Sequence, residues 1–126
     1  ESLLQRAWQA SVDTVGADHP HTLELQRLLA ESLLAQGRMD SAEQAFRSVL
    51  ALGPQRMARH SNRLAWTRCG LARTLRANGQ REESDRLLTQ AAADFRRNYG
   101  GRHSLQAVIE KLLASRQTDT RPPMLS

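Results

Sequence analysis

The chain has 126 residues, the material of one domain, and only 4% are aromatic, so its core must be built mainly from Leu and Ala. Both residues lose little free energy on entering a helix, and the composition therefore favours helices over strands. The net charge of +5 permits binding to acidic protein segments or nucleic acid, while the single cysteine, Cys69, excludes an internal disulfide, and no apolar run is long enough to span a membrane.

The first predicted helix covers residues 1–15. Leu4, Trp8 and Val12 recur at helical spacing and define one apolar side. The chain opens at Glu1 without a Met, so we expect it to be a piece of a longer protein.

A turn is predicted over Gly16–Thr22, because Gly16 can adopt a positive φ after a helix end. Asp18 or His19 can cap the next helix, and Pro20 suits its first turn. That helix is predicted over residues 20–36, with Gly37 ending it. Its apolar seam is formed by Leu25, Leu29 and Leu33.

The second half of the chain continues this alternation of helices and glycine turns. Asp40 and Glu43 have the spacing of a capping box, and Gly53–Pro54 is predicted to stop the helix that follows. Further helices are expected over residues 55–77, closed by Asn78–Gly79, and 82–98. A last helix is expected over residues 103–117, and two prolines with no apolar period predict a flexible tail over 118–126.

Short segments recur in the chain at a spacing of 42 residues. Ala30, Ala72 and Ala114 are equally spaced, and Gly37 and Gly79 have the same separation. Self-similarity at a fixed period of this size predicts a stacked repeat array. We therefore divide residues 1–117 into a partial repeat (1–15), repeats near 20–53 and 55–99, and the final helix 103–117.

The recurring residues resemble the tetratricopeptide repeat, with small residues at Ala30 and Ala72 and the turn glycines at Gly37 and Gly79. The turn Gly16–Thr22 looks like the junction found in kinesin light chains and in many bacterial signalling proteins. The resemblance implies an all-α, right-handed superhelical array of about six antiparallel helices. It also implies that the chain belongs to a bacterial signalling or regulatory protein and works in the cytoplasm.

In the tetratricopeptide family the first helix of each repeat lines a concave groove. Carried over by position, Trp66 becomes an apolar anchor of a ligand groove and the basic residues become anion contacts. The competing interpretation is a solvated Arg-rich face with Trp66 partly packed in the stack. The asparagine pair of the kinesin light chain type is absent, which departs from its peptide-binding pattern. The candidate groove residues are Arg27, Glu31, Trp66, Cys69, Arg73, Arg76 and Lys111.

Catalysis and cofactor binding have little support in the sequence. His19 and His21 lie two residues apart in a turn, whereas a metal site needs three or four converging ligands. Cys69 has no companion for nucleophilic catalysis and is expected to be a packed thiol. No phosphate-binding loop or zinc spacing occurs, so we expect no enzyme activity, no metal and no cofactor.

Two functions therefore compete. The first is a protein-interaction module that holds a protein or peptide segment, acidic or mixed in charge, in the groove. The alternative is binding of single-stranded RNA or DNA, which the Arg excess favours and the scarcity of aromatic residues disfavours. The apolar side of helix 1–15 has no partner helix in the chain, and we expect it to form a homodimer or to contact another domain.

Overall fold

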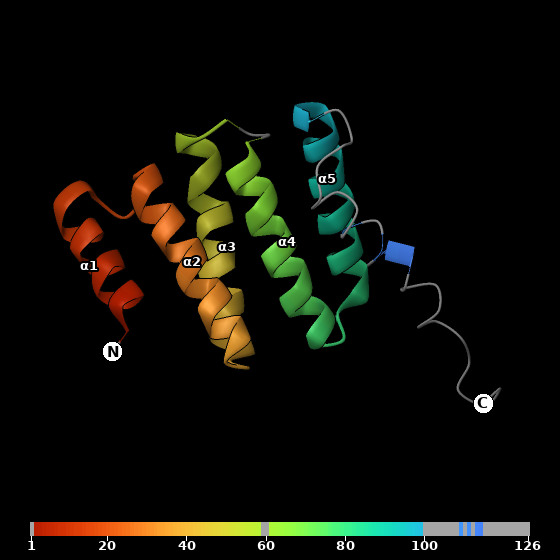
Figure 1. Ribbon diagram of the computed structural model, residues 1–126, viewed down its shortest axis with the longest axis horizontal. Coiled ribbons are helices and arrows are strands. Elements are labelled where there is room, and N and C mark those ends of the chain that lie inside the picture. The colour runs from red at the N-terminus through yellow and green to blue at the C-terminus, as the bar shows by residue number, and fades with distance from the viewer. Residues whose placement is uncertain (1, 59–60, 100–108, 110, 112, 115–126) are drawn as a thin grey trace.

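The computed structural model describes residues 2–58, 61–99, 109, 111, 113 and 114. Within these residues the chain forms five helices and no strand: α1 (Leu3–Val15), α2 (Pro20–Ala35), α3 (Met39–Arg56), α4 (Asn62–Ala77) and α5 (Arg81–Tyr99). Figure 1 shows them side by side in chain order, with α1 at one end of the row and α5 at the other. The all-helical repeat architecture predicted from the sequence is confirmed.

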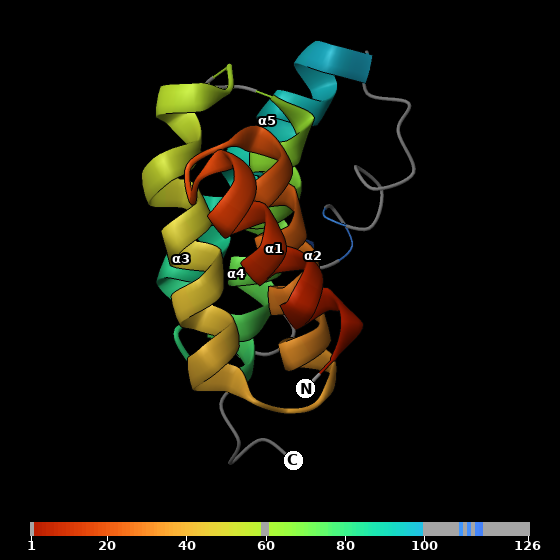
Figure 2. The ribbon, with the colours of Figure 1, turned by 90° about the vertical axis from the view of Figure 1, so that its left-hand side faces the viewer.

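The helices pack as successive pairs. α2 pairs with α3, α4 pairs with α5, and α3 joins the two pairs by packing on α4. Seen along the array from the α1 end, α2 and α3 lie on opposite sides (Figure 2). α2 also contacts α4, so the first helices of the two pairs are neighbours and share one face of the molecule.

The predicted glycine turns have the same hydrogen bonds in both repeats. Gly37 and Gly79 have φ values of 80° and 82°, in the left-handed region that glycine adopts without strain. After Gly37, the Arg38 N–H donates to the Leu33 carbonyl at 2.9 Å, and after Gly79 the Gln80 N–H donates to the Leu75 carbonyl at 2.8 Å. Each glycine therefore ends its helix in a Schellman motif.

The start of α2 agrees with the prediction, whereas the start of α4 does not. His19 caps α2, since its Nδ1 accepts a hydrogen bond from the His21 N–H at 3.0 Å. The predicted helix over 55–77 is wrong in its first turns, because α4 begins at Asn62 after the cap Ser61. Ser61 lies 42 residues after His19, so the caps follow the repeat although the residue types differ.

Both predicted ends of the preceding helix are also corrected. Asp40 lies within the first turn of α3, and the N-cap residue Arg38 makes no side-chain capping bond, so the predicted capping box does not form. Gly53–Pro54 does not stop α3, which continues to Arg56. Pro54 cannot donate the backbone hydrogen bond to residue 50, but a kink at this point displaces only the two residues of α3 that follow it. Gly53 itself lies so close to Leu64 of α4 that a Cβ would collide with that side chain.

The core consists of small and aliphatic residues from the helix pairs, as the composition predicts. Phe46 and Leu88 occupy equivalent positions 42 residues apart, and their exposed fractions are 0% and 1%. Ala72 is also fully buried, in the core cluster that α4 and α5 share. In α2 the predicted seam is rotated: Leu25, Leu29 and Leu33 are half-buried, and the fully buried apolar residues are Leu23 and Ala30.

The structure describes the α1 end of the array almost completely, and the other end beyond α5 only at a few residues. The predicted helix 103–117 lies mostly outside the described residues, and the predicted tail 118–126 lies wholly outside them. Ile109, which is described as helical, is buried in the cluster that contains Ala72. At the other end, α1 packs on α2, and its outer side leaves Leu3 81% exposed.

Candidate functional site

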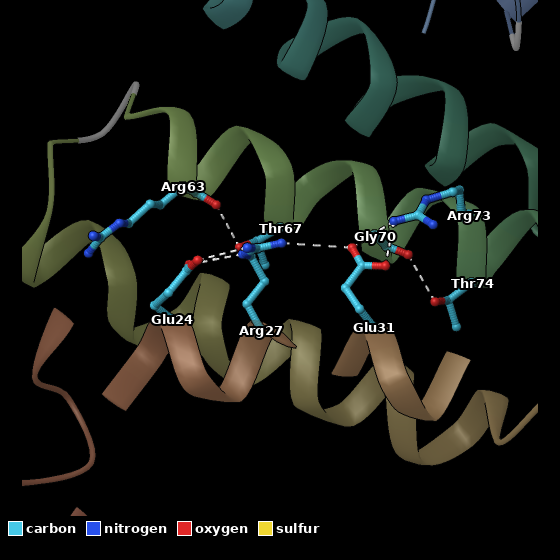
Figure 3. Close-up of polar contacts among 8 residues, drawn as sticks. All are labelled: Glu24, Arg27, Glu31, Arg63, Thr67, Gly70, Arg73 and Thr74. Carbon is cyan, nitrogen blue, oxygen red and sulfur yellow. Dashed lines mark hydrogen bonds and ion pairs between the residues drawn. The ribbon is translucent and has the colours of Figure 1, made fainter. Parts of the chain in front are cut away.

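The face shared by α2 and α4 carries most of the residues that the sequence indicated. We define the α2–α4 face by Glu24, Arg27 and Glu31 from α2 and Trp66 and Arg73 from α4. Figure 3 shows that the charged side chains among them form a row between the two helices. Each repeat contributes one helix to this face because the first helices of successive pairs are in contact.

Arg27 is the most deeply placed charge of this face. Its exposed fraction is 7%, and it donates two hydrogen bonds to the Glu24 carboxylate, at 2.9 Å from Nε and 2.7 Å from Nη2. The hydrogen bond from Arg27 lowers the pKa of Glu24, and the same bond raises the pKa of Arg27. The Arg27 guanidinium also lies 5.3 Å from the centroid of the Trp66 ring, a cation–π distance. Both the edge and the face of this guanidinium are therefore occupied within the protein.

Glu31 connects the two arginines of the face. Its carboxylate oxygens lie 2.6 Å and 2.7 Å from Nη2 of Arg73, and one of them lies 3.9 Å from Nη1 of Arg27 (Figure 3). Glu31 and Arg73 are 42 residues apart, so they occupy the same position in successive repeats. Equivalent positions of neighbouring repeats lie next to each other along the face, which explains why opposite charges at this spacing pair.

Trp66 is the exposed aromatic residue of the face. Its exposed fraction is 40%, and it borders a hollow of about 180 Å³. The other residues that line this hollow are Glu24, Arg27, Asn62 and Arg63. The hollow thus combines an indole with charged side chains of both signs.

Cys69 faces the core rather than this hollow. It is 6% exposed and belongs to the cluster around Ala72 and Leu88. Burial raises the pKa of the thiol to about 12, so it is protonated at neutral pH and is a poor nucleophile. The interpretation of Cys69 as a packed thiol fits this environment better than a place on a ligand surface.

The α4 residues beneath the face are buried. Thr67 and Thr74 have no exposed surface, and their hydroxyls donate to the carbonyls of Arg63 and Gly70 at 2.8 Å and 2.9 Å (Figure 3). Gly70 is tightly enclosed, since a Cβ there would collide with the Phe46 ring. Close helix packing, rather than ligand approach, accounts for glycine at this position.

The seven candidate residues are thus not equivalent. The structure brings Arg27, Glu31, Trp66 and Arg73 together, whereas Cys69 points inward. Arg76 lies one turn beyond Arg73 and is half-buried, and Lys111 is exposed. Sequence reasoning did not select Asn62 or Arg63, which the structure adds to the hollow. The signal that could have found them is their position four and three residues before Trp66, the spacing of neighbours on a helix surface.

Larger hollows lie elsewhere on the described part of the molecule. One of about 660 Å³ runs beside α5, at Glu83 and Leu87, and one of about 420 Å³ lies between α1 and α2, at Ser11 and Leu25. Neither is lined by a tryptophan, and neither contains the candidate residues. We therefore assign the candidate site to the smaller hollow beside Trp66, where an exposed aromatic ring and ion pairs meet.

Nowhere in the described part of the chain do three or more His, Cys, Asp or Glu side chains gather as a metal ion would require. Among the same residues, no helix is both long enough and apolar enough to cross a membrane.

Comparison with known proteins identifies the repeats. A family model for the tetratricopeptide repeat matches residues 64–105. Two crystal structures are similar over 90% of the chain, both of nearly identical TPR-like repeats of a Podosopora anserina protein described as a kinesin light chain. One of them is the structure of a single-substitution variant, and each has a TM-score of 0.81 and 26% sequence identity. No curated protein sequence matches the chain significantly.

The chain is therefore an all-helical repeat protein of the tetratricopeptide class. More narrowly, its repeats are of the kinesin-light-chain-like type, as the turn Gly16–Thr22 and the 42-residue spacing indicated. It spans about half the length of these solved structures, 53% and 54%. Tetratricopeptide folds generally serve as scaffolds for protein–protein interaction.

Proposed function

We propose that the chain is a non-catalytic interaction module that binds a protein or peptide segment on the α2–α4 face. The observation that carries the proposal is Trp66, a large aromatic side chain 40% exposed at the edge of a hollow. Aromatic residues placed in such pockets often dominate the affinity of a protein interface. The Arg27 guanidinium behind the ring holds the indole in place, so a ligand meets a preorganised surface.

The opposing interpretation is that Trp66 only packs within the stack. Its contact with Arg27 accounts for part of the ring, but 40% of the residue stays in contact with solvent. Leu64 and Ala65, which precede it in α4, have no exposed surface. Trp66 is therefore exposed because it lies on the solvent-facing side of a well-packed helix, and not because the segment is loosely packed.

The charges of the face favour a segment of mixed composition. Arg27 and Arg73 interact with Glu24 and Glu31, so the acidic preference predicted from the sequence has less support than the apolar contact. Arg63 is an exposed cation of the hollow, and the Glu24 carboxylate next to it is partly exposed. We propose an apolar side chain on Trp66 flanked by polar or mixed-charge residues.

The wider setting follows the resemblance to kinesin-light-chain-like repeats. We propose a cytoplasmic role within a larger bacterial signalling or regulatory protein. Self-association through the outer side of α1 stays a prediction, motivated by the exposure of Leu3 and the half-buried Leu4, Trp8 and Val12.

A display library of random peptides tests the binding site. Segments selected on the immobilised chain are synthesised, and their affinities are measured by calorimetry for the wild type and for Trp66→Ala. We expect at least about a tenfold loss of affinity, because truncating a central aromatic anchor costs about 2 kcal/mol or more. Trp8→Ala on α1 is the matched control, since it removes the same side chain from another surface and should leave the affinity within about twofold.

Two outcomes contradict the proposal. One is an equal loss of peptide affinity in Trp66→Ala and Trp8→Ala, or no loss in either variant, while circular dichroism shows that helicity is retained. The other is tight binding of a single-stranded RNA or DNA oligonucleotide at physiological salt, which would favour the nucleic-acid alternative. For nonspecific phosphate contacts the affinity falls steeply with salt, and substitution of Arg47 or Arg97, away from the α2–α4 face, would then weaken binding as much as substitution of Arg73.

A further inference from the structure

The carboxylate of Glu31 lies where an acidic ligand would have to bind. Both of its oxygens are within 2.7 Å of Nη2 of Arg73, and one approaches Nη1 of Arg27 at 3.9 Å. Arginine recognises carboxylates through such charge-assisted hydrogen bonds. An incoming Glu or Asp side chain would therefore find Nη2 of Arg73 already engaged by Glu31 and would meet the negative charge of Glu31 beside it.

The two arginines differ in how readily they could change partners. The Arg27 side chain is 9% exposed, donates two hydrogen bonds to Glu24 and lies on Trp66. The Arg73 side chain is 45% exposed, and its bonds on this face go to Glu31, whose side chain is 28% exposed. Ion pairs as exposed as this contribute little to stability and exchange with solvent. A ligand carboxylate can thus reach Arg73, and Glu31 competes with that carboxylate for the Arg73 guanidinium.

We propose that Glu31 is an internal carboxylate ligand that sets the specificity of the α2–α4 face against acidic segments. While Glu31 is present, binding an acidic group to Arg73 requires breaking an existing ion pair and places a second negative charge beside the first. Without it, Arg73 becomes available and the repulsion disappears. This inference rests on the proposed function, because it assigns the charge selectivity of the same face.

The test uses a defined probe, a fluorescein-labelled hexaglutamate peptide, and fluorescence anisotropy at low ionic strength. Glu31→Gln keeps the shape of the side chain and removes its charge. We expect this variant to bind the probe about tenfold more tightly than the wild type, since close charge pairs are strong when weakly screened. Adding Arg73→Gln to Glu31→Gln should remove the gain.

Glu43→Gln is the matched control for net charge. Glu43 lies on α3 and accepts from Nε of Arg47 at 2.9 Å, while Arg47 also donates two bonds to Glu83. Removing the Glu43 charge changes the net charge by the same amount but leaves Arg47 bound to Glu83. We expect Glu43→Gln to change the affinity for hexaglutamate by less than about twofold.

Equal gains from Glu31→Gln and Glu43→Gln would overturn the proposal, because net charge alone would explain them. No gain from Glu31→Gln in a folded protein would overturn it as well, and Glu31→Ala repeats the measurement with a variant that cannot bond to Arg73. The two tests use different ligands: the Trp66 test measures the selected peptides, whereas this test measures hexaglutamate, a peptide without apolar side chains. A failed test of Trp66 and a failed test of Glu31 are therefore separate results.

Discussion

At the scale of single residues, Gly70 shows how packing can override local preference. A Cβ at this position in α4 would collide with the fully buried Phe46 ring and crowd the Glu31 carboxylate. In an open helix, Gly→Ala is favourable by about 1 kcal/mol. We expect Gly70→Ala instead to lower the free energy of unfolding by about 1–3 kcal/mol, the usual cost of overpacking a core. Urea denaturation followed by circular dichroism measures the change, and a gain in stability would contradict the account.

At the scale of elements, the cap at Ser61 decides where α4 begins. Its hydroxyl accepts a hydrogen bond from the Leu64 N–H at 3.3 Å, next to residues that enter the core. Replacing a capping serine by alanine costs about 1 kcal/mol, and we expect Ser61→Ala to lower the unfolding free energy by that amount. In the same Ser61→Ala variant, the first backbone amides of α4 should exchange their hydrogens faster than in the wild type.

Ser2→Ala is the comparison for this prediction. Ser2 caps α1 in the same way, accepting from the Gln5 N–H at 3.1 Å, but among the described helices α1 packs mainly on α2. A lost cap there should mainly increase local fraying, with a smaller effect on global unfolding. Equal global losses for the two serine variants would contradict this difference between a terminal and an internal helix.

At the scale of the whole molecule, ion pairs join segments that are distant in the sequence. Arg56 binds Asp18 at 2.6 Å, and Arg47 binds Glu83 at 3.0 Å. Hydrogen bonds from these arginines lower the pKa of Asp18 and Glu83, as the bond from Arg27 lowers that of Glu24. A carboxyl group whose folded pKa is below its unfolded value stabilises the fold fully above the unfolded pKa. That contribution disappears as pH falls through the folded pKa.

We therefore expect the melting temperature to be constant near neutral pH and to fall as the pH drops below about 4.5, the region where unfolded Glu and Asp titrate. The decrease should be modest, because most of these pairs are exposed. Calorimetry across this pH range measures it, and Glu24→Gln should reduce the dependence. A melting temperature that rises on acidification would contradict the sign of these shifts.

Much of the architecture could be predicted because its signals are local. Ala30 and Ala72, with the turn glycines Gly37 and Gly79, repeat within segments of a few residues, and a helix end needs only its own turn to form. The prediction of a helix end at Gly53–Pro54 was wrong because packing against another helix, and not a turn, requires the glycine. Gly53 precedes a proline and suggested a stop, but it is glycine because Leu64 of α4 packs against it.

The sequence by itself determined the class of the protein, the order of its helices and the face on which Trp66 and the charged residues gather, since each depends on spacing along one chain. Only the tertiary structure decided which of those residues are available. Arg27 is buried under Trp66, Cys69 turns into the core, and Arg73 is engaged by Glu31 from the preceding repeat. These outcomes depend on the rotation of α2 and α4 about their axes and on contacts across 42 residues, which are properties of packed helices and not of any one of them.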